Sequence, residues 1–312
     1  MTAAVLLDVV HETRYEYSAP VSLAHHLAHL RPLSDAHQQL QAFDLDIEPP
    51  PSHSRDGSDA LGNAERHFSL AAPHPMLRVR ASSRVQLQPR FADLQPASSP
   101  PWETLAARLR YVARAPFVPE LEFALPSPYV PRLAALRRFA LVSFTPGRPL
   151  AAAAIDLMQR VHSEFAYKSR STQVGTPLAE ILEHKRGVCQ DFSHVMAGAM
   201  RMLGLPVRYV SGYLLTMAPA SGAAMKGADA SHAWVQVWCP GTRGVPADGW
   251  LDLDPTNRLV PASGHVRLAV GRDFGDVTPL RGVIRGGGGR HTLHVRVSTR
   301  VVKPALMESR TP

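Results

Sequence analysis

The chain has 312 residues, of which 45% are hydrophobic and 19% charged, so it is long and apolar enough for one large or two ordinary domains with buried cores. No apolar stretch reaches the roughly 18 residues of a transmembrane helix, so we expect no membrane association. Lys and Arg exceed Asp and Glu by 34 − 26 = 8, but these charges are scattered singly without a basic stripe, so we expect no nucleic-acid partner.

The start of the chain predicts a location and a redox state. Residues Met1 to Leu7 contain a short apolar run without a cationic leader or a small-residue cleavage site, so we expect no signal peptide and a cytoplasmic protein. The two cysteines, Cys189 and Cys239, are then expected to stay reduced rather than to form a disulfide.

Strand-like segments dominate the beginning of the chain. Stretches rich in β-forming residues, separated by turn clusters, lie at residues 5–17, 40–47, 64–70 and 77–87. Pro20 is expected to end the first of them. Short strands at this spacing predict a β-sandwich-like module over residues 1–90.

A stretch rich in proline and alanine follows over residues 91–149, with short helical pieces such as Trp102–Val112. Prolines interrupt these pieces, so we expect a connector packed on the next domain. Pro149 then precedes a helical segment, Leu150–Phe165, which begins the third predicted region, a core over residues 150–312.

The core begins with helices and continues with strands. Two further helices are predicted between Pro177 and Leu203, separated by Gly187, and the second begins near Cys189. Alternating strands follow at residues 207–215, 233–239, 250–254, 293–297 and 299–302. This order predicts an α+β fold with an antiparallel sheet.

Cys189 opens an amphipathic helix directly after Gly187 and Val188. The positive end of the helix dipole and the unpaired N–H groups of the first turn favour a thiolate, which is the nucleophilic form of cysteine. The same N–H groups could hold an oxyanion. Taken alone, this position would also suit a buried, inert cysteine.

His232 stands at the start of one predicted strand, and Asp252 and Asp254 stand at the end of the next. A turn-rich loop joins the two strands, so antiparallel pairing is expected, which places the histidine beside one of the acids. Side-chain alternation does not separate the acids, because both point to the same face. Either acid would fix the imidazole tautomer of a Cys–His–Asp site.

These residues lie in blocks that resemble the bacterial transglutaminase-like family, namely Gly187–His194, Ala230–Val235, Gly249–Trp250 and Asp254–Asn257. Two further blocks, residues 208–213 and 270–277, also resemble the family. Toward the N-terminus, the blocks Tyr15–Tyr17, Arg31–Pro32 and Gly62–Asn63 resemble the family's β-rich N-terminal module. The resemblance implies a papain-like core with Cys189 as nucleophile, His232 as base and Asp254 as orienting acid. Asp252 is an additional acid relative to the family pattern.

The implied activity is acyl transfer through a thioester, with a protein or peptide amide as substrate and no metal or cofactor. The acceptor could be water, as in an amidase or peptidase, or an amine, as in a cross-linking enzyme, because both share the first half-reaction. A catalytically inactive binding or scaffold module with the same fold is the alternative. The complete Cys–His–Asp set argues against it.

Two other motifs suggest ligands only weakly. His25, His26 and His29 include a helical metal-ligand spacing, but no cysteine or acid lies near them in the sequence, so a packing or solvated role is expected. Gly286–Gly289 is not followed by the Gly-Lys-Ser/Thr of a phosphate loop and is expected to form a turn.

Four further polar residues receive no catalytic role. Cys239 shares a strand face with apolar residues and is expected in the core. Asp191, in the first helical turn, is expected to act as a structural cap. Asp273 and Asp276 match the family's late block, and the sequence suggests no role for either.

Overall fold

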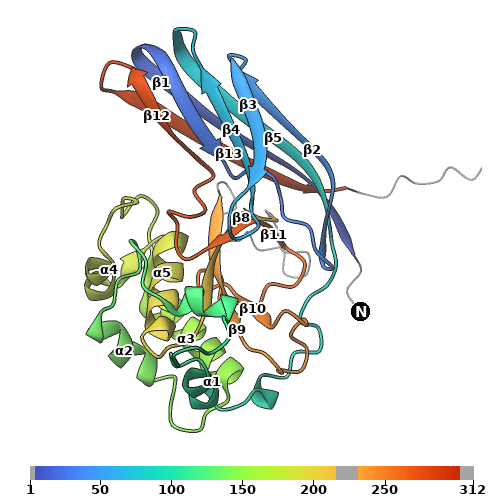
Figure 1. The fold of residues 1–312 in the computed structure, drawn as a ribbon, viewed down its shortest axis with the longest axis vertical. Helices are drawn as coiled ribbons and strands as arrows, with labels where there is room; N and C mark the ends of the chain where they lie inside the picture. The colour runs from blue at the N-terminus through green and yellow to red at the C-terminus, as the bar shows by residue number, and fades with distance from the viewer. Residues whose placement is uncertain (1–3, 216–230, 303–312) are drawn as a thin grey trace, which may run out of the picture.

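The computed structural model describes residues 4–215 and 231–302, so Ala230 of the histidine motif and the first three residues of the chain lie outside it. Figure 1 shows two bodies: a β-rich module above, and below it helices packed against a second sheet. The second sheet is antiparallel throughout, which confirms the expected α+β class with an N-terminal β module.

Seven strands form the module: β1 (Val5–Ala28), β2 (Gln38–Glu48), β3 (His53–Ser58), β4 (Ala64–Leu70), β5 (His74–Leu87), β12 (Leu280–Gly286) and β13 (His291–Val301). The first half of β1 pairs with β5 and β13, and its second half pairs with β4 and β12. β2 extends the sheet beside β5, and β3 extends it beside β4.

Strand β1 continues beyond Pro20, where the sequence predicted its end. Its pairing with β5 shifts register between Glu16 and Val21. Its pairing with β13 ends at Tyr17, and its pairing with β12 begins at Val21. The proline therefore sits where β1 changes partners, and no ladder hydrogen bond is lost there.

The end of the chain returns to the N-terminal module. β12 and β13 both pair antiparallel with β1 and lie beside it in Figure 1. The predicted core over residues 150–312 is therefore too long, since residues 280–301 belong to the β module. The sequence predicted strands at residues 293–297 and 299–302, which together correspond to β13, but it did not predict β12 and did not say which sheet β13 joins.

The core holds five helices and a four-stranded sheet within the described residues. The helices are α1 (Trp102–Arg108), α2 (Ala134–Leu141), α3 (Leu150–Glu164), α4 (Leu178–His184) and α5 (Cys189–Arg201), with short 3₁₀ turns at Pro96–Ser98 and Pro119–Ala124. The sheet has the order β10 (Trp250–Leu253), β9 (His232–Trp238), β8 (Val207–Leu214), β11 (His265–Gly271). A two-stranded parallel pair, β6 (Ala166–Tyr167) and β7 (Arg186–Gly187), precedes α5.

Helix α5 lies at the centre of the core. Every residue from Asp191 to Arg201 is buried, and the helix packs against β8 and β9 on one side and α2, α3 and α4 on the other. Because both sides are covered, the helix is held rigidly, and its first residue is fixed relative to the sheet. None of the helices in the described ranges is long and apolar enough to cross a bilayer.

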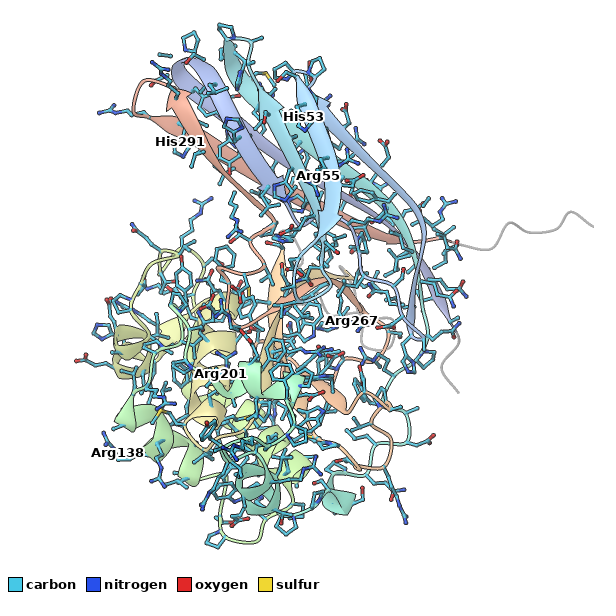
Figure 2. The ribbon with its side chains drawn as sticks, viewed as in Figure 1. His53, Arg55, Arg138, Arg201, Arg267 and His291 are labelled. Carbon is cyan, nitrogen blue, oxygen red and sulfur yellow. The ribbon has the colours of Figure 1, made fainter. Side chains whose placement is uncertain are left out.

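The two bodies share a hydrophobic core and a polar joint. Leu7 and Val297 of the module pack in one cluster with Tyr213 and Val266 of the core sheet. Arg267 of β11, labelled between the two bodies in Figure 2, forms an ion pair with Asp35 of the module. Such a continuous interface predicts that the two bodies behave as one unit.

Candidate active site

Cys189 is the first residue of α5 and is half-buried. The N–H of Val188 donates to Asp191 Oδ2 at 2.8 Å, and Thr172 Oγ1 donates to the same oxygen at 2.7 Å. A Cβ on Gly187 would lie 2.6 Å from that oxygen, so only glycine leaves room for the contact. Asp191 thus fixes the backbone that presents the thiol.

His232 begins β9, where it pairs with Gly212 of β8. Its side chain is fully buried, and its Nε2 lies 2.9 Å from Asp254 Oδ2. The Trp234 ring stacks on the imidazole, with ring centroids 6.2 Å apart and planes 22° from parallel. The tryptophan and the carboxylate together fix the orientation of the ring.

Cys189 lies close enough to His232 to raise the pKa of the imidazole. Since Nε2 binds Asp254, Nδ1 is the nitrogen left for the thiol. Nδ1 has no partner of standard hydrogen-bond geometry in the described parts of the chain, so the thiol–imidazole contact is looser than an ordinary hydrogen bond. Loose contacts between nucleophile and base are common when no substrate is bound.

The pKa of His232 is raised above its ordinary value. Burial alone would lower the pKa of this imidazole, but the charges of Asp254 and Cys189 and their hydrogen bonds outweigh burial. A histidine in this setting holds its proton at neutral pH and can pair with a thiolate.

Asp254 accepts five hydrogen bonds from residues that the structure describes. His232, His265 and Asn257 donate side-chain N–H groups to Oδ2 over 2.9 to 3.0 Å, and the backbone N–H groups of Thr256 and Asn257 donate to Oδ1. Burial raises the pKa of this carboxyl, but the His232 charge and the two histidine hydrogen bonds lower it well below its usual range. The carboxylate is therefore ionised.

Asp252 has a different partner. Its Oδ2 accepts a hydrogen bond of 2.8 Å from Arg90 Nη1, and both side chains are buried. The structure thus brings His232 and Asp254 together and places Asp252 in an ion pair with Arg90, which follows β5. The pairing of β9 with β10 alone did not distinguish the two acids.

His265 is a site residue that the sequence did not suggest. It begins β11, is buried, and donates from Nε2 to Asp254 Oδ2 at 3.0 Å. Its ring also meets Trp234 edge-to-face at 5.0 Å. One histidine among 15 carries no signal by itself. The signal becomes visible only when β11 is known to pair with β8, beside β9.

Two groups of side chains in the described ranges have the spacing of metal ligands. One is His232, Asp254 and His265, whose ligand atoms lie within 4.8 Å of one another. In that group both imidazole Nε2 atoms donate to the carboxylate, so the ligand atoms are already paired with one another and the contacts account for it as a polar network. The other group, His29, Asp59 and Glu65, lies in the β module.

The remaining polar residues that the sequence singled out lie outside this network. Cys239 is fully buried in the main core, and burial raises the pKa of its thiol. Asp273 accepts hydrogen bonds from the backbone N–H groups of Tyr129 and Gly275, and Asp276 binds Arg272. Both acids hold the turn after β11.

The glycine run and two of the early histidines also differ from ligand motifs. Gly286–Gly289 forms the turn between β12 and β13, with positive φ at each glycine. His25 and His26 lie in β1 and not on a helix, so they do not have the spacing that a helical metal site would need.

A thiol at a helix N-terminus with a buried His–Asp pair beside it is typical of cysteine-nucleophile proteins. The chain belongs to the transglutaminase-like superfamily. Residues 143–255 match the Transglutaminase-like superfamily, and residues 7–86 match the bacterial transglutaminase-like N-terminal region.

Known proteins resemble this chain over different lengths. An uncharacterised protein of Mycobacterium tuberculosis is 37% identical over 279 residues, which is 88% of this chain and 86% of that protein. A protein-glutamine gamma-glutamyltransferase of Pseudomonas aeruginosa is 30% identical over 117 residues, or 36% of this chain and 17% of that protein. The solved structure of a candidate cysteine protease from Cytophaga hutchinsonii has the same fold, with a TM-score of 0.71, 18% identity, and coverage of 97% of this chain and 92% of that one.

Proposed function

We propose that the protein is a cysteine acyltransferase or hydrolase that cleaves a carboxamide of a protein or peptide through a thioester on Cys189. The observation that carries this proposal is the buried 2.9 Å contact between His232 and Asp254, beside a half-buried thiol at the start of α5. A buried ion pair used only for stability would not need a nucleophile facing its imidazole.

In the first half-reaction, the Cys189 thiolate attacks the amide carbonyl carbon, and a C–S bond forms while the oxygen takes up an electron pair. The first N–H groups of α5 are suited to hold this oxyanion, because they have no acceptor within the helix. As the C–N bond breaks, the His232 imidazolium gives its proton to the leaving nitrogen. The products are the thioester, a neutral imidazole and ammonia or an amine.

In the second half-reaction, water or a primary amine attacks the thioester. The neutral imidazole of His232 takes the proton of the attacking group, the C–S bond breaks, and thiolate and imidazolium are restored. Asp254 holds the ring in the tautomer that presents Nδ1 to the sulfur.

Intact-protein mass spectrometry after incubation with glutamine-containing peptides tests the proposal. The expected adduct has the mass of the peptide less ammonia. A labelled primary amine that attacks this thioester should release the peptide from Cys189 and become joined to it. Cys189→Ala should form no adduct, whereas Cys239→Ala should form it like the wild type. If no peptide leaves an adduct, and Cys189 is alkylated by iodoacetamide no faster than a free thiol, the binding-module alternative replaces this proposal.

We further propose that the enzyme acts in the cytoplasm. Both cysteines of the chain are free, and a catalytic thiol remains reduced in that compartment. Cell fractionation checks this: recovery of the protein in a periplasmic or membrane fraction would contradict it.

A further inference from the structure

We propose that the β module binds a divalent transition-metal ion between His29, Asp59 and Glu65, at its joint with the core. One ligand atom from each of the three side chains lies within 4.8 Å of the others. This is a structural site, separate from Cys189 and independent of the proposed catalysis.

His29 is the residue that points to a cation. Its side chain is 1% exposed, and its Nδ1 lies 3.1 Å from the backbone carbonyl oxygen of Thr278. A carbonyl can only accept, so Nδ1 carries a proton, and in the neutral ring Nε2 presents a lone pair. Metal-binding histidines are commonly oriented in this way, through a hydrogen bond from the other ring nitrogen.

Nε2 of His29 faces a carboxylate. Nε2 lies 3.3 Å from Glu65 Oε1, but the contact lacks hydrogen-bond geometry, and Nε2 has no hydrogen-bond partner in the described parts of the chain. A buried nitrogen without a partner, directed at a carboxylate, is unfavourable. A cation bound by both atoms would give the nitrogen a partner and compensate the carboxylate.

Asp59 is held in place as a ligand by its own hydrogen bonds. Its Oδ1 accepts the N–H groups of Leu61 and Asn63 at 2.8 Å, and its Oδ2 accepts Asn63 Nδ2 at 2.7 Å. Asn63 is fully buried and also bonds to the N–H and C=O of Val270 in β11. The site is therefore built at the point where the module is joined to the core.

The donor set selects the class of metal. One imidazole nitrogen and two carboxylates suit Zn²⁺ and its first-row neighbours, whereas Ca²⁺ and Mg²⁺ prefer oxygen ligands alone. The two carboxylate charges balance a divalent ion. Asp59 and Glu65 are only partly buried, which leaves a path for the ion, and water or the exposed His67 could complete the coordination.

Thermal unfolding of the full chain, first stripped with a chelator, tests the proposal. The Cys189→Ala background removes the thiol as a competing zinc ligand. Added Zn²⁺ at about a hundred times its dissociation constant should raise the Tm by roughly 4 °C, and Mg²⁺ should not. Elemental analysis should give one zinc ion per chain.

Two variants and a control locate the ion. Glu65→Gln should lose the zinc-dependent rise in Tm, and so should His29→Asn, whose amide can still donate to Thr278 while lacking the distal nitrogen. His53→Asn is the control, since His53 is exposed and stands apart from the joint in Figure 2. If His29→Asn does not fold, Glu65→Gln decides. An unchanged zinc response in Glu65→Gln, or an equal response to Mg²⁺, would overturn the proposal.

Discussion

The carboxylate of Asp254 is fully buried, and its charge is compensated by donors on every side. Such a group is costly to bury unless all its lone pairs are used. Because its folded pKa is lowered, its contribution to stability is present above the ordinary carboxyl pKa of about 3.9 and is lost as the pH falls toward the folded value. We therefore expect the site to keep its charges across the neutral range.

Replacing Asp254 should affect reactivity, and replacing Asp252 should affect stability. Asp254→Asn should slow Cys189 alkylation and reduce turnover by about 10⁴, because the imidazole loses its orienting acid. Asp252→Asn should leave the alkylation rate near that of the wild type but cost roughly 3 kcal/mol or more, because Arg90 would stay buried without its partner. Iodoacetamide kinetics and urea unfolding measure the two effects.

Exchanged phenotypes would show that Asp252 is the orienting acid. The sequence marks Asp252 only as an additional acid and does not reveal that it is buried beside a cation. That cation is Arg90, which follows β5 and whose contact with Asp252 no local pattern reveals.

His265 is expected to act as a positioning residue through Asp254. Its hydrogen bond lowers the pKa of Asp254, so His265→Ala should raise that pKa and move the acid limb of the alkylation pH profile to higher pH. His265→Gln can still donate from its amide nitrogen and should restore the profile. A purely structural role predicts lower stability in both variants with an unmoved acid limb.

At the scale of elements, the start of α5 decides how the thiol is presented. Gly187→Ala should displace the Asp191 cap, because the added Cβ would lie 2.6 Å from its carboxylate oxygen. Such overpacking costs about 1–3 kcal/mol, and loss of the cap should slow Cys189 alkylation. Gly175→Ala is the matched control in the neighbouring loop, where a Cβ meets nothing within 4 Å. Equal alkylation rates in the two variants would mean that the cap does not position the thiol.

The elements that sequence patterns predicted well are those with a buried face. The segment 64–70 matches β4 residue for residue, and α3 and α5 begin where they were expected. Strand β3 was missed because all six of its residues are exposed, so no apolar alternation marks it. Strand β11 was missed because all seven of its residues are buried, which removes the alternation as well.

This dependence on local sequence patterns also explains which parts of the candidate site the sequence predicted. Cys189, His232 and Asp254 lie at the ends of predicted elements, and pairing of two neighbouring strands placed the last two together. His265 and Arg90 come from segments whose contacts depend on the whole topology. Long-range contacts of this kind are set by the fold and leave no periodic signal in the sequence.

At the scale of the whole molecule, the chain passes between the two bodies twice, from the module to the core after β5 and back to the module before β12. The chain returns from the core after β11, and β12 and then β13 pair with β1, β13 over eleven positions, Leu7 to Tyr17. Thr299 Oγ1 of β13 also donates to the carbonyl oxygen of Leu214 in the core sheet at 2.6 Å. We infer that the module and the core unfold together.

Val297 tests this coupling, because it lies in the shared cluster with Tyr213 and Val266, while its neighbour on the same strand, Val295, faces solvent. Val297→Ala removes buried methyl groups and should cost about 2 kcal/mol, which lowers the Tm by several degrees. Val295→Ala has the same chemistry at a 40% exposed position and should change stability by less than about 0.5 kcal/mol. Calorimetry should show one transition for the wild type, shifted as a whole by Val297→Ala. Two separate transitions, with only the module destabilised, would show that the joint does not couple the bodies.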